Sequence, residues 1–462
     1  MRPFWLEQAL CKDGELAPAL SGPRFADICI VGGGYTGLWT AIQTKLKNPK
    51  LDIVILEGDI CGAGASGRNG GCVLTWSAKF LSLCQLFGED EAIRLVKASE
   101  DAVQHIGDFC KHNGIDAEFR HDGTLYTATN QAQVGALAPV MAALEAHGIH
   151  SYRALPAQEV AQKSGSVKNM AGVFSPFAAT VQPAKLVRGL RRVALQMGVR
   201  IHERSPMTGF DKSHPVVVHT PCGSVTASQL VLATNAWMAS MFTQFERSIA
   251  IVSSDMVIIE KCPELLEQVG LSDGVSVLDS RTFVYYYRRT PDGRLMLGKG
   301  GNTFAYKGKI KAVFDQRSPY EHQLTQALHG FFPTLAAVPI TASWNGPSDR
   351  SVSGFPFFGR LDGASNIFYG FGYSGNGVGP SYMGGQLLSS LLLDLDNAWT
   401  RSPLAHGPLG HFPPEPFRYA GSLMVRHAIR RKERAEDDNR QPWLVDKWLS
   451  QLANAAGKAD KA

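Results

Sequence analysis

The chain lacks the features that mark metal-binding, membrane-spanning and nucleic-acid-binding proteins. Its eight cysteines are scattered, with no C-x-x-C pair and no cysteine–histidine cluster at zinc spacing, so we expect no metal site. The longest apolar run, residues 387–395, contains two serines and an aspartate and is too short to cross a membrane. A net charge of +5 on 462 residues is too small to indicate a basic surface for nucleic-acid binding.

The N-terminal sequence MRPFWLEQAL also lacks the apolar core of a secretory signal. With 44% hydrophobic and 19% charged residues, the composition suits a globular protein of two or three domains. Together with the scattered thiols, these features predict a reducing, cytoplasmic location.

Glycine is abundant, and one glycine cluster is the most informative part of the chain. Residues 26–57 are typical of a strand, a tight turn, a helix and a second strand. Gly32, Gly34 and Gly37 supply G-x-G-x-x-G, and Glu57 ends the second strand about 20 residues later, where a dinucleotide fold needs a carboxylate for the ribose hydroxyls. Two other matches to the glycine pattern, at 62–67 and 370–375, lack this full context. The first match therefore predicts the nucleotide-binding turn.

The order of predicted elements indicates two interleaved domains. Helical spacing covers 91–110 and continues after 182, whereas 251–260 and the hairpin 283–300 are strongly β. We expect an α/β protein in which a doubly wound, Rossmann-like domain alternates with an antiparallel β-sheet domain that also carries helices. The tail after 412 contains the basic sequence VRHAIRRKER. Because its apolar face is short, we expect a helix docked on the protein rather than a membrane-binding helix.

Five segments in order resemble the D-amino-acid-oxidase-like flavoprotein superfamily. They are ADICIVGGGYTGLWTAI, GASGRNGG, QPAKLVRGL with GVRIHERSPMTGF, LVLATNAW, and PFFGRLDGASNIFYGFGYSGNGVG. The sequence is most similar to the gamma-glutamylputrescine-oxidase-like branch, with glycine and sarcosine oxidases as more distant relatives. The resemblance implies a discontinuous FAD-binding domain at 24–84, 177–245 and 338–400. It implies a substrate domain at 85–176 and 246–337, followed by a C-terminal helical extension at 401–462.

The resemblance also implies a set of FAD-binding residues. The first turn contributes Gly32, Gly34, Tyr35, Thr36, Gly37 and Glu57. The second segment would wrap the pyrophosphate and the flavin edge, and Met207 would pair its backbone with adenine. The end of the strand before residue 234 and the glycine loop at 372–378 supply the other residues of the set. The remaining predicted residues are Ala65, Ser66, Arg68, Asn69, Gly70, Gly71, Thr234, Asn235, Ala236, Trp237, Gly372, Gly375, Asn376, Gly377 and Val378.

Two departures from the superfamily pattern bear on linkage and substrate. Relatives that attach the flavin covalently use a cysteine in the segment corresponding to 341–360 or a histidine near the N-terminal loop. This chain has no cysteine after Cys262 and no histidine before His105, so we expect noncovalent FAD, with Cys61 and Cys72 packed as small hydrophobic residues. Sarcosine-oxidase-like members also carry a lysine after the last loop, where this chain has Gly379. Because only Arg68 lies in the early loop, a clamp for an α-carboxylate looks incomplete, which favours an amine substrate.

The hairpin supplies the candidate catalytic residues. Tyr285 and Tyr287 share one strand face and Tyr286 the other, and the resemblance favours Tyr286 facing the flavin. Some relatives hold a lysine over the flavin to stabilise superoxide, which implies this role for Lys299. A core tyrosine and an exposed strand-end lysine are the alternatives.

These features predict an FAD-dependent oxidoreductase that oxidises the C–N bond of an amine or amino-acid-like substrate. Hydride would pass to flavin N5, the imine would hydrolyse in water, and molecular oxygen would reoxidise the flavin. The alternatives are a dehydrogenase of the same class with another electron acceptor, or a flavin-binding regulatory protein without turnover.

Overall fold

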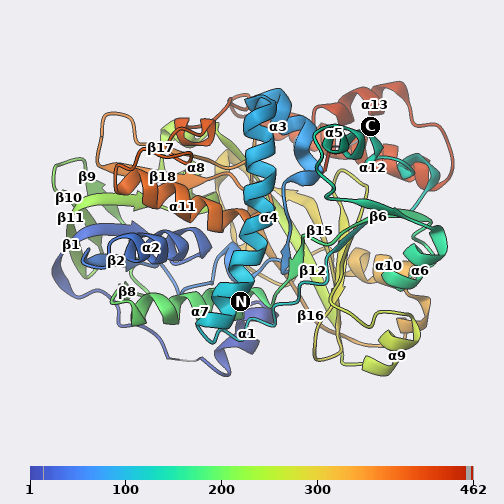
Figure 1. The fold of residues 1–462 in the computed structure, drawn as a ribbon, viewed down its shortest axis with the longest axis horizontal. Helices are drawn as coiled ribbons and strands as arrows, with labels where there is room; N and C mark the ends of the chain where they lie inside the picture. The colour runs from blue at the N-terminus through green and yellow to red at the C-terminus, as the bar shows by residue number, and fades with distance from the viewer. Residues whose placement is uncertain (14, 454–458, 461–462) are drawn as a thin grey trace.

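Two eight-stranded sheets organise the molecule (Figure 1). The computed structural model describes residues 1–13, 15–453 and 459–460. One sheet carries the predicted nucleotide-binding segments, and the other carries the β-rich block of the sequence. The long helix α4 (Glu89–His112) runs between them in Figure 1 and matches the expected helix at 91–110.

The first sheet has the parallel core of a doubly wound domain. Its order is β17 (Phe357–Arg360), β18 (Ile367–Phe371), β11 (Gly223–Leu232), β1 (Gly22–Val31), β2 (Ile53–Leu56) and β8 (Arg200–His202). All neighbours are parallel except β17, which is antiparallel to β18. Strands β9 (Gly209–Asp211) and β10 (Val216–Thr220) extend the sheet antiparallel beside β11.

Alternating residues of this sheet face two separate cores. Ile28 and Ile30 belong to the core that includes α2 (Tyr35–Lys47), α7 (Pro183–Gln196) and α11 (Pro380–Leu392). Cys29 and Val31 face the other core, on the side of β9 and β10. This period of two buries both faces of β1, as a parallel strand covered on both sides requires.

The second sheet contains the β-rich block of the sequence. Its order is β16 (Ile340–Ser351), β12 (Ile249–Ile259), β15 (Leu295–Phe304), β14 (Tyr285–Arg289), β13 (Ser276–Asp279), β4 (Thr124–Ala128), β6 (Ala171–Ser175) and β5 (Arg153–Leu155). The expected hairpin forms between β14 and β15. The sheet is not wholly antiparallel, because β13 and β4 run parallel.

One strand of the interval 338–400 belongs to the second sheet. The interval 338–400 was expected to belong to the FAD-binding domain, but β16 pairs along its length with β12 of the second sheet. The chain returns to the first sheet only at β17. Strand β16 of the second sheet therefore contacts the loops that follow strands of the first sheet.

Smaller elements complete the described part of the chain. The C-terminal extension contains α12 (Phe417–Asp437) and α13 (Leu444–Gln451), at the upper right of Figure 1. None of the helices described is both long and apolar enough to cross a membrane. The other elements are α1 (Phe4–Leu10), α3 (Phe80–Phe87), α5 (Ala138–Ala146), α6 (Ala157–Ser164), α8 (Met238–Met241), α9 (Pro263–Gln268), α10 (Glu321–Phe331), and the strand pair β3 (Cys72–Val73) and β7 (Ala179–Thr180).

Candidate functional site

The first glycine turn lies between β1 and α2, where the backbone approaches two neighbouring segments. Gly32 has φ +116°, and a Cβ there would lie 2.5 Å from the carbonyl oxygen of Ala233. A Cβ on Gly37 would lie 2.0 Å from the oxygen of Gly32. Only glycine fits both positions, so the turn has the close packing that a pyrophosphate-binding loop needs before a helix N-terminus.

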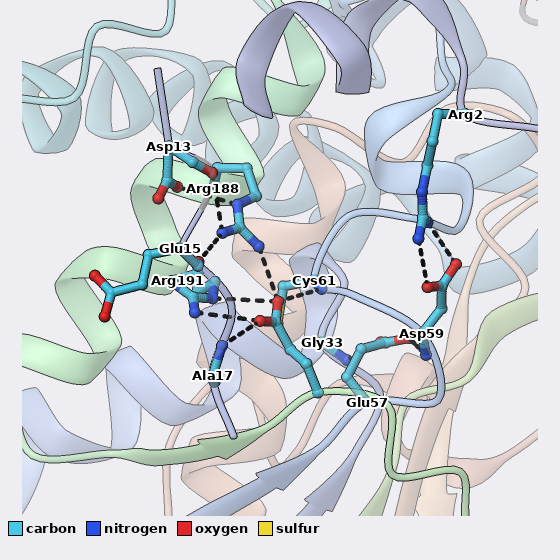
Figure 2. A network of polar contacts seen from close by, with 11 residues as sticks. Arg2, Asp13, Glu15, Ala17, Gly33, Glu57, Asp59, Cys61, Arg188 and Arg191 are labelled. Carbon is cyan, nitrogen blue, oxygen red and sulfur yellow. Dashed lines mark hydrogen bonds and ion pairs between the residues drawn. The ribbon is translucent and has the colours of Figure 1, made fainter. Parts of the chain in front are cut away.

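Glu57 lies at the end of β2, beside this turn. Its carboxylate accepts hydrogen bonds from the backbone N–H of Gly33 at 2.7 Å and of Asp59 at 2.9 Å (Figure 2). Burial raises the pKa of Glu57, although the two N–H donors act in the opposite direction. Asp59 is in turn paired with Arg2 at 2.5 Å. The predicted ribose carboxylate is therefore held at the turn before any ligand arrives.

A second carboxylate behind the turn was not predicted from the sequence. Glu203 is fully buried and bonds Arg188 at 2.8 Å and Arg191 at 3.2 Å. It also accepts hydrogen bonds from the backbone N–H of Cys61 and Ala17 (Figure 2). Burial acts to raise the pKa of Glu203, but the N–H donors and the two arginines outweigh it and lower the pKa. This ion cluster ties α7 and the N-terminal segment to the loop before the second glycine segment.

Polar side chains of the second glycine segment, 62–71, form hydrogen bonds with its own backbone and with the first turn. Ser66 Oγ accepts the N–H of Tyr35 at 2.9 Å, which joins this segment to the first turn. Asn69 donates to the carbonyls of Ala65 and Ser66 and accepts from the N–H of Gly71. These bonds fix the loop in place. They assign Asn69 a structural role in addition to its predicted contact with the cofactor.

Arg68 is engaged with protein groups rather than extended into open space. Its Nε donates to the carbonyl of Ala63 at 2.6 Å, and its guanidinium pairs with Asp315 at 2.6 Å. The side chain still lines the cavity described below. Its charge is therefore already balanced by a carboxylate.

The third glycine loop is held by two residues of β16 that sequence reasoning missed. Asp349 accepts the backbone N–H groups of Gly372, Tyr373 and Ser374 at 2.5–3.3 Å. Burial raises the pKa of Asp349 to about 6, with the N–H donors opposing the shift. Arg350 donates to the carbonyl oxygen of Ser374. The signal in the sequence was the charged pair Asp349–Arg350 at the end of a strand, 23 positions before Gly372, with β17 and β18 in between.

The three loops and the second sheet enclose one cavity. It contains about 1100 Å³ of space between protein atoms, part of which is open to solvent. The pocket side of the second sheet contributes Ser254, Met256, Gly300, Ser348 and Arg350. The predicted residues that line the cavity are Tyr35, Thr36, Ala65, Ser66, Arg68, Asn69, Gly70, Asn235, Tyr286, Gly375, Asn376, Gly377 and Val378.

The other predicted cofactor residues do not line this cavity. Gly71 and Gly372 have φ of +75° and +92° and shape the loop backbones. Thr234 donates to the sulfur of Met241, and Ala236 packs in the core near β9 and β10. Trp237 and Met207 are half-buried against the same core. The predicted pairing of Met207 with adenine stays a prediction.

Two buried acceptors show that the residues present fit a bound flavin nucleotide. Asn235 Oδ1 and Asn376 Oδ1 are buried without a hydrogen-bond partner in the described part of the chain. Both residues line the cavity, and Asn235 has φ +50°. A buried amide oxygen without a partner is costly, so a ligand that donates hydrogen bonds would satisfy it. The N–H of a flavin ring and the hydroxyls of its side chain are such donors.

The two candidate catalytic residues lie on opposite faces of the second sheet. Tyr286 lines the cavity and its hydroxyl lies 3.0 Å from Ser254 Oγ. Lys299 pairs in register with Tyr285, whose side chain faces away from the cavity. Its Nζ donates to the carbonyl of Phe283 at 2.7 Å and lies 3.9 Å from the centre of the Tyr285 ring. This corrects the expectation for Lys299: strand register directs it away from the flavin side, and it is buried rather than exposed.

Comparisons with known proteins agree with this site. The family model for FAD-dependent oxidoreductases matches residues 27–391. Gamma-glutamylputrescine oxidoreductase from Escherichia coli is 30% identical over 370 residues, covering 79% of this chain and 83% of that protein. Glycine oxidase from Geobacillus kaustophilus is 22% identical over 397 residues, covering 82% and 96%. The solved glycine oxidase structure from that organism superposes with a TM-score of 0.68 at 20% identity, over 83% of this chain and 98% of that one.

The fold and the family match together define an FAD-dependent oxidoreductase of amine or amino-acid-like substrates. The chain belongs to the FAD-dependent oxidoreductase family that includes D-amino-acid-oxidase-like enzymes. The resemblance noted from the sequence is confirmed, including the similarity to gamma-glutamylputrescine oxidoreductase and to glycine and sarcosine oxidases.

The Glu203 cluster leads to a first prediction, on stability. Replacing Glu203 by Gln leaves Arg188 and Arg191 buried beside a neutral group, with Asp13 as the remaining carboxylate partner of Arg188. We expect the free energy of unfolding to fall by about 3–5 kcal/mol, measured by urea denaturation. Asp396→Asn, which removes an exposed partner of Arg401, is the matched control and should leave stability unchanged. A Glu203→Gln loss no larger than that of the control would contradict this role.

Asp349 leads to a second prediction, on pH dependence. Its pKa is about 6 in the folded protein against 3.8 for an unperturbed aspartate, so the folded state binds the proton more tightly. The resulting stability is present below about pH 4 and is lost as the pH rises through about 6, on the order of 3 kcal/mol in total. Asp349→Asn removes this titration. The difference in unfolding free energy between wild type and variant should therefore change between pH 4 and pH 7, and a constant difference would show that Asp349 has an ordinary pKa.

Proposed function

We propose that this protein oxidises the C–N bond of an amine with noncovalently bound FAD. The observation that carries the proposal is the cavity where three glycine loops meet the pocket face of the second sheet, lined by Asn235 and Asn376, whose buried amide oxygens have no partner in the described part of the chain. When bound, FAD supplies the acceptor, flavin N5, for a hydride from the carbon beside the substrate nitrogen, and the imine product hydrolyses in water.

The chain's own residues position and desolvate the reacting groups. The α11 helix begins at Pro380, directly after the third loop, so its N-terminal dipole favours negative charge at the cavity. Burial raises the pKa of the Tyr286 hydroxyl, which is therefore a neutral hydrogen-bonding group at physiological pH. Met256 and Val284 contribute apolar lining that excludes water from the reaction. No side-chain base is required for hydride removal from a neutral amine.

Noncovalent binding is supported by the thiols near the cavity. Cys61 is buried beside Gly33, and burial raises the pKa of its thiol well above the usual value, which disfavours a nucleophilic thiolate. Cys72 lines the cavity from β3 and is therefore the cysteine to examine for attachment. All eight cysteines are free of disulfides, in keeping with the proposed cytoplasmic location.

A third prediction concerns the cofactor linkage. Purified protein should be yellow, and acid or heat should release all of its flavin as FAD, measured by absorbance of the supernatant. Flavin fluorescence that stays with the protein band on a denaturing gel would contradict the noncovalent linkage, and Cys72→Ser would then identify the attachment site. Colourless protein that FAD cannot reconstitute would contradict the cofactor assignment.

The substrate class is proposed from the charges at the cavity. Gly379, directly before α11, stands where sarcosine-oxidase-like members carry a lysine, and the charge of Arg68 is balanced by Asp315. Arg68 is the one cation of the early loop, but Arg350 on β16 also lines the cavity. Arg350 packs against Gly375 and donates to Ser374, so part of its donor capacity serves the loop. We therefore propose a primary or secondary amine, including conjugates with a carboxylate far from the reacting carbon. The similarity to gamma-glutamylputrescine oxidoreductase supports this class.

A fourth prediction tests this class. Under anaerobic conditions, amines should bleach the flavin absorbance faster than free α-amino acids. A missing charge-assisted contact to the α-carboxylate should cost an amino acid about 1.5–3 kcal/mol, on the order of ten- to a hundredfold in binding. If glycine, sarcosine or a D-amino acid reduces the flavin faster than every amine tested, the proposed class is wrong.

Molecular oxygen is the proposed electron acceptor, and the position of Lys299 bears on it. Since Lys299 faces away from the cavity, its charge does not support a role in stabilising superoxide. The alternative is a dehydrogenase of the same class with another acceptor. Stopped-flow mixing of reduced protein with air-saturated buffer distinguishes the two, because slow reoxidation with fast reduction of an artificial dye identifies a dehydrogenase.

A further inference from the structure

Arg288, on β14, is a fully buried cation next to the cavity. It lies two positions from Tyr286, which lines the cavity, so the period of two along a strand places both residues on the same face of the second sheet. Its Nε donates to the carbonyl oxygen of Gly70 at 2.7 Å, and its Nη2 donates to that of Val181 at 2.7 Å. Because Gly70 lines the cavity, the guanidinium lies directly against the backbone of the second glycine segment.

The close approach of Arg288 to this segment requires glycine at position 71. Gly71 has φ +75°, and a Cβ there would lie 2.6 Å from Arg288 Nη2. The guanidinium carbon also lies 5.1 Å from the centre of the Trp5 ring, which belongs to α1. These contacts hold the cation in one position beside a segment that the sequence predicts to wrap the flavin edge.

The charge of Arg288 is not neutralised by an ion pair. Both of its hydrogen-bond acceptors are backbone carbonyls, and no carboxylate lies within ion-pair distance of it in the part of the chain that the structure describes. Burial lowers the pKa of Arg288, and the Cys72 thiol, which opposes this shift most, carries no charge when it is protonated. Since a guanidinium keeps its proton in proteins, Arg288 is a buried positive charge, which is costly without a counter-charge.

The carboxylates that act on Arg288 from further away are engaged with other cations. Glu118 and Asp292 both oppose the lowering of its pKa. Glu118 is paired with Lys185 at 2.5 Å. Asp292 is paired with Arg294 at 3.3 Å. The positive potential of Arg288 therefore extends to the segment that lines the cavity.

We propose that Arg288 is a positioning residue that raises the reduction potential of the flavin by stabilising the negative charge of its reduced ring. The inference rests on the proposed function, because it takes FAD as the cofactor. A hydride from the substrate carbon brings two electrons and one proton to flavin N5, so the ring gains one negative charge. A fixed cation in a buried site stabilises such a charge more strongly than it would in water. Arg288 acts from the second glycine segment, whereas the dipole of α11 acts from the third loop.

Midpoint potentials of the FAD-loaded protein and its variants, measured by equilibration with reference dyes, test this role. Arg288→Met removes the charge and keeps much of the length of the side chain. We expect its potential to fall by about 30 mV or more, which is tenfold in the equilibrium constant of a two-electron couple. The dissociation constant of sulfite, which adds to N5 and leaves negative charge on the ring, should rise about tenfold for the same reason. Arg288→Lys restores a positive charge and should keep both values within about threefold of wild type.

Arg289→Met is the matched control. Arg289 is the next residue of the same strand, so it points to the other face of the sheet, where it is also buried and pairs with Glu267 at 3.2 Å. Its replacement should leave the potential unchanged. If Arg288→Met does not hold FAD, Arg288→Gln, which keeps an N–H donor without the charge, provides the same comparison with Arg288→Lys.

Several outcomes would overturn the role of Arg288. They are an unchanged potential in the neutral variant, an equal shift in the control, or a fall in Arg288→Lys as large as in Arg288→Met, which would show that hydrogen bonds to the loop matter and the charge does not. Weaker FAD binding with an unchanged potential would assign the charge to the pyrophosphate instead. Wild-type protein that binds no FAD would contradict the proposed function itself, which keeps the two failures distinguishable.

Discussion

Three carboxylates, two fully buried and one half-buried, fix the loops around which the rest of the site is arranged. Glu57 accepts backbone N–H groups at the first turn, Glu203 accepts those of Cys61 and Ala17, and Asp349 accepts three in the third loop. Glycine-rich loops lose much conformational entropy when they order, and a carboxylate that accepts N–H groups offsets part of this loss within the folded protein. The loops are therefore shaped by the protein and not by their ligand.

The pKa values of these three carboxylates shift in different directions, because the groups around them differ. Glu203 has two arginines, and its pKa is lowered despite burial. Glu57 and Asp349 rely mainly on N–H dipoles, and burial raises both pKa values. A flavin pyrophosphate brings more negative charge to the first turn. The two arginines of the ion cluster behind that turn are balanced by Glu203 and Asp13, so the backbone N–H groups and the dipole at the start of α2 are what favour this anion.

The sequence predicted the residues whose partners lie nearby in the chain and missed those whose partners lie far away in it. Gly32, Gly34, Gly37 and Glu57 lie within one strand–turn–helix–strand unit, so spacing alone located them. Asp349 and Glu203 act across the fold, and Glu203 is 142 positions from Cys61, so no local pattern indicates their partners. Lys299 shows a second limit. In a strand, a shift of one position changes the face, and only the register between β14 and β15 decided that Tyr286 faces the cavity and Lys299 does not.

Because side chains alternate between the two faces of a strand, the face of the second sheet opposite the cavity carries a separate polar network. Asp255 pairs in register with Lys299 and bonds Ser253, Ser318 and Asn302 in the interior.

Asn302 extends this network to the C-terminal extension. It receives Arg430 of α12 at 3.0 Å on its side-chain oxygen. One continuous set of polar contacts therefore runs from α12 to strands whose opposite face, at Ser254 and Gly300, lines the cavity. Because α12 also contacts α13 through the Arg431–Asp446 pair, a chain of directional polar contacts joins α13 to strands that line the cavity on their other face.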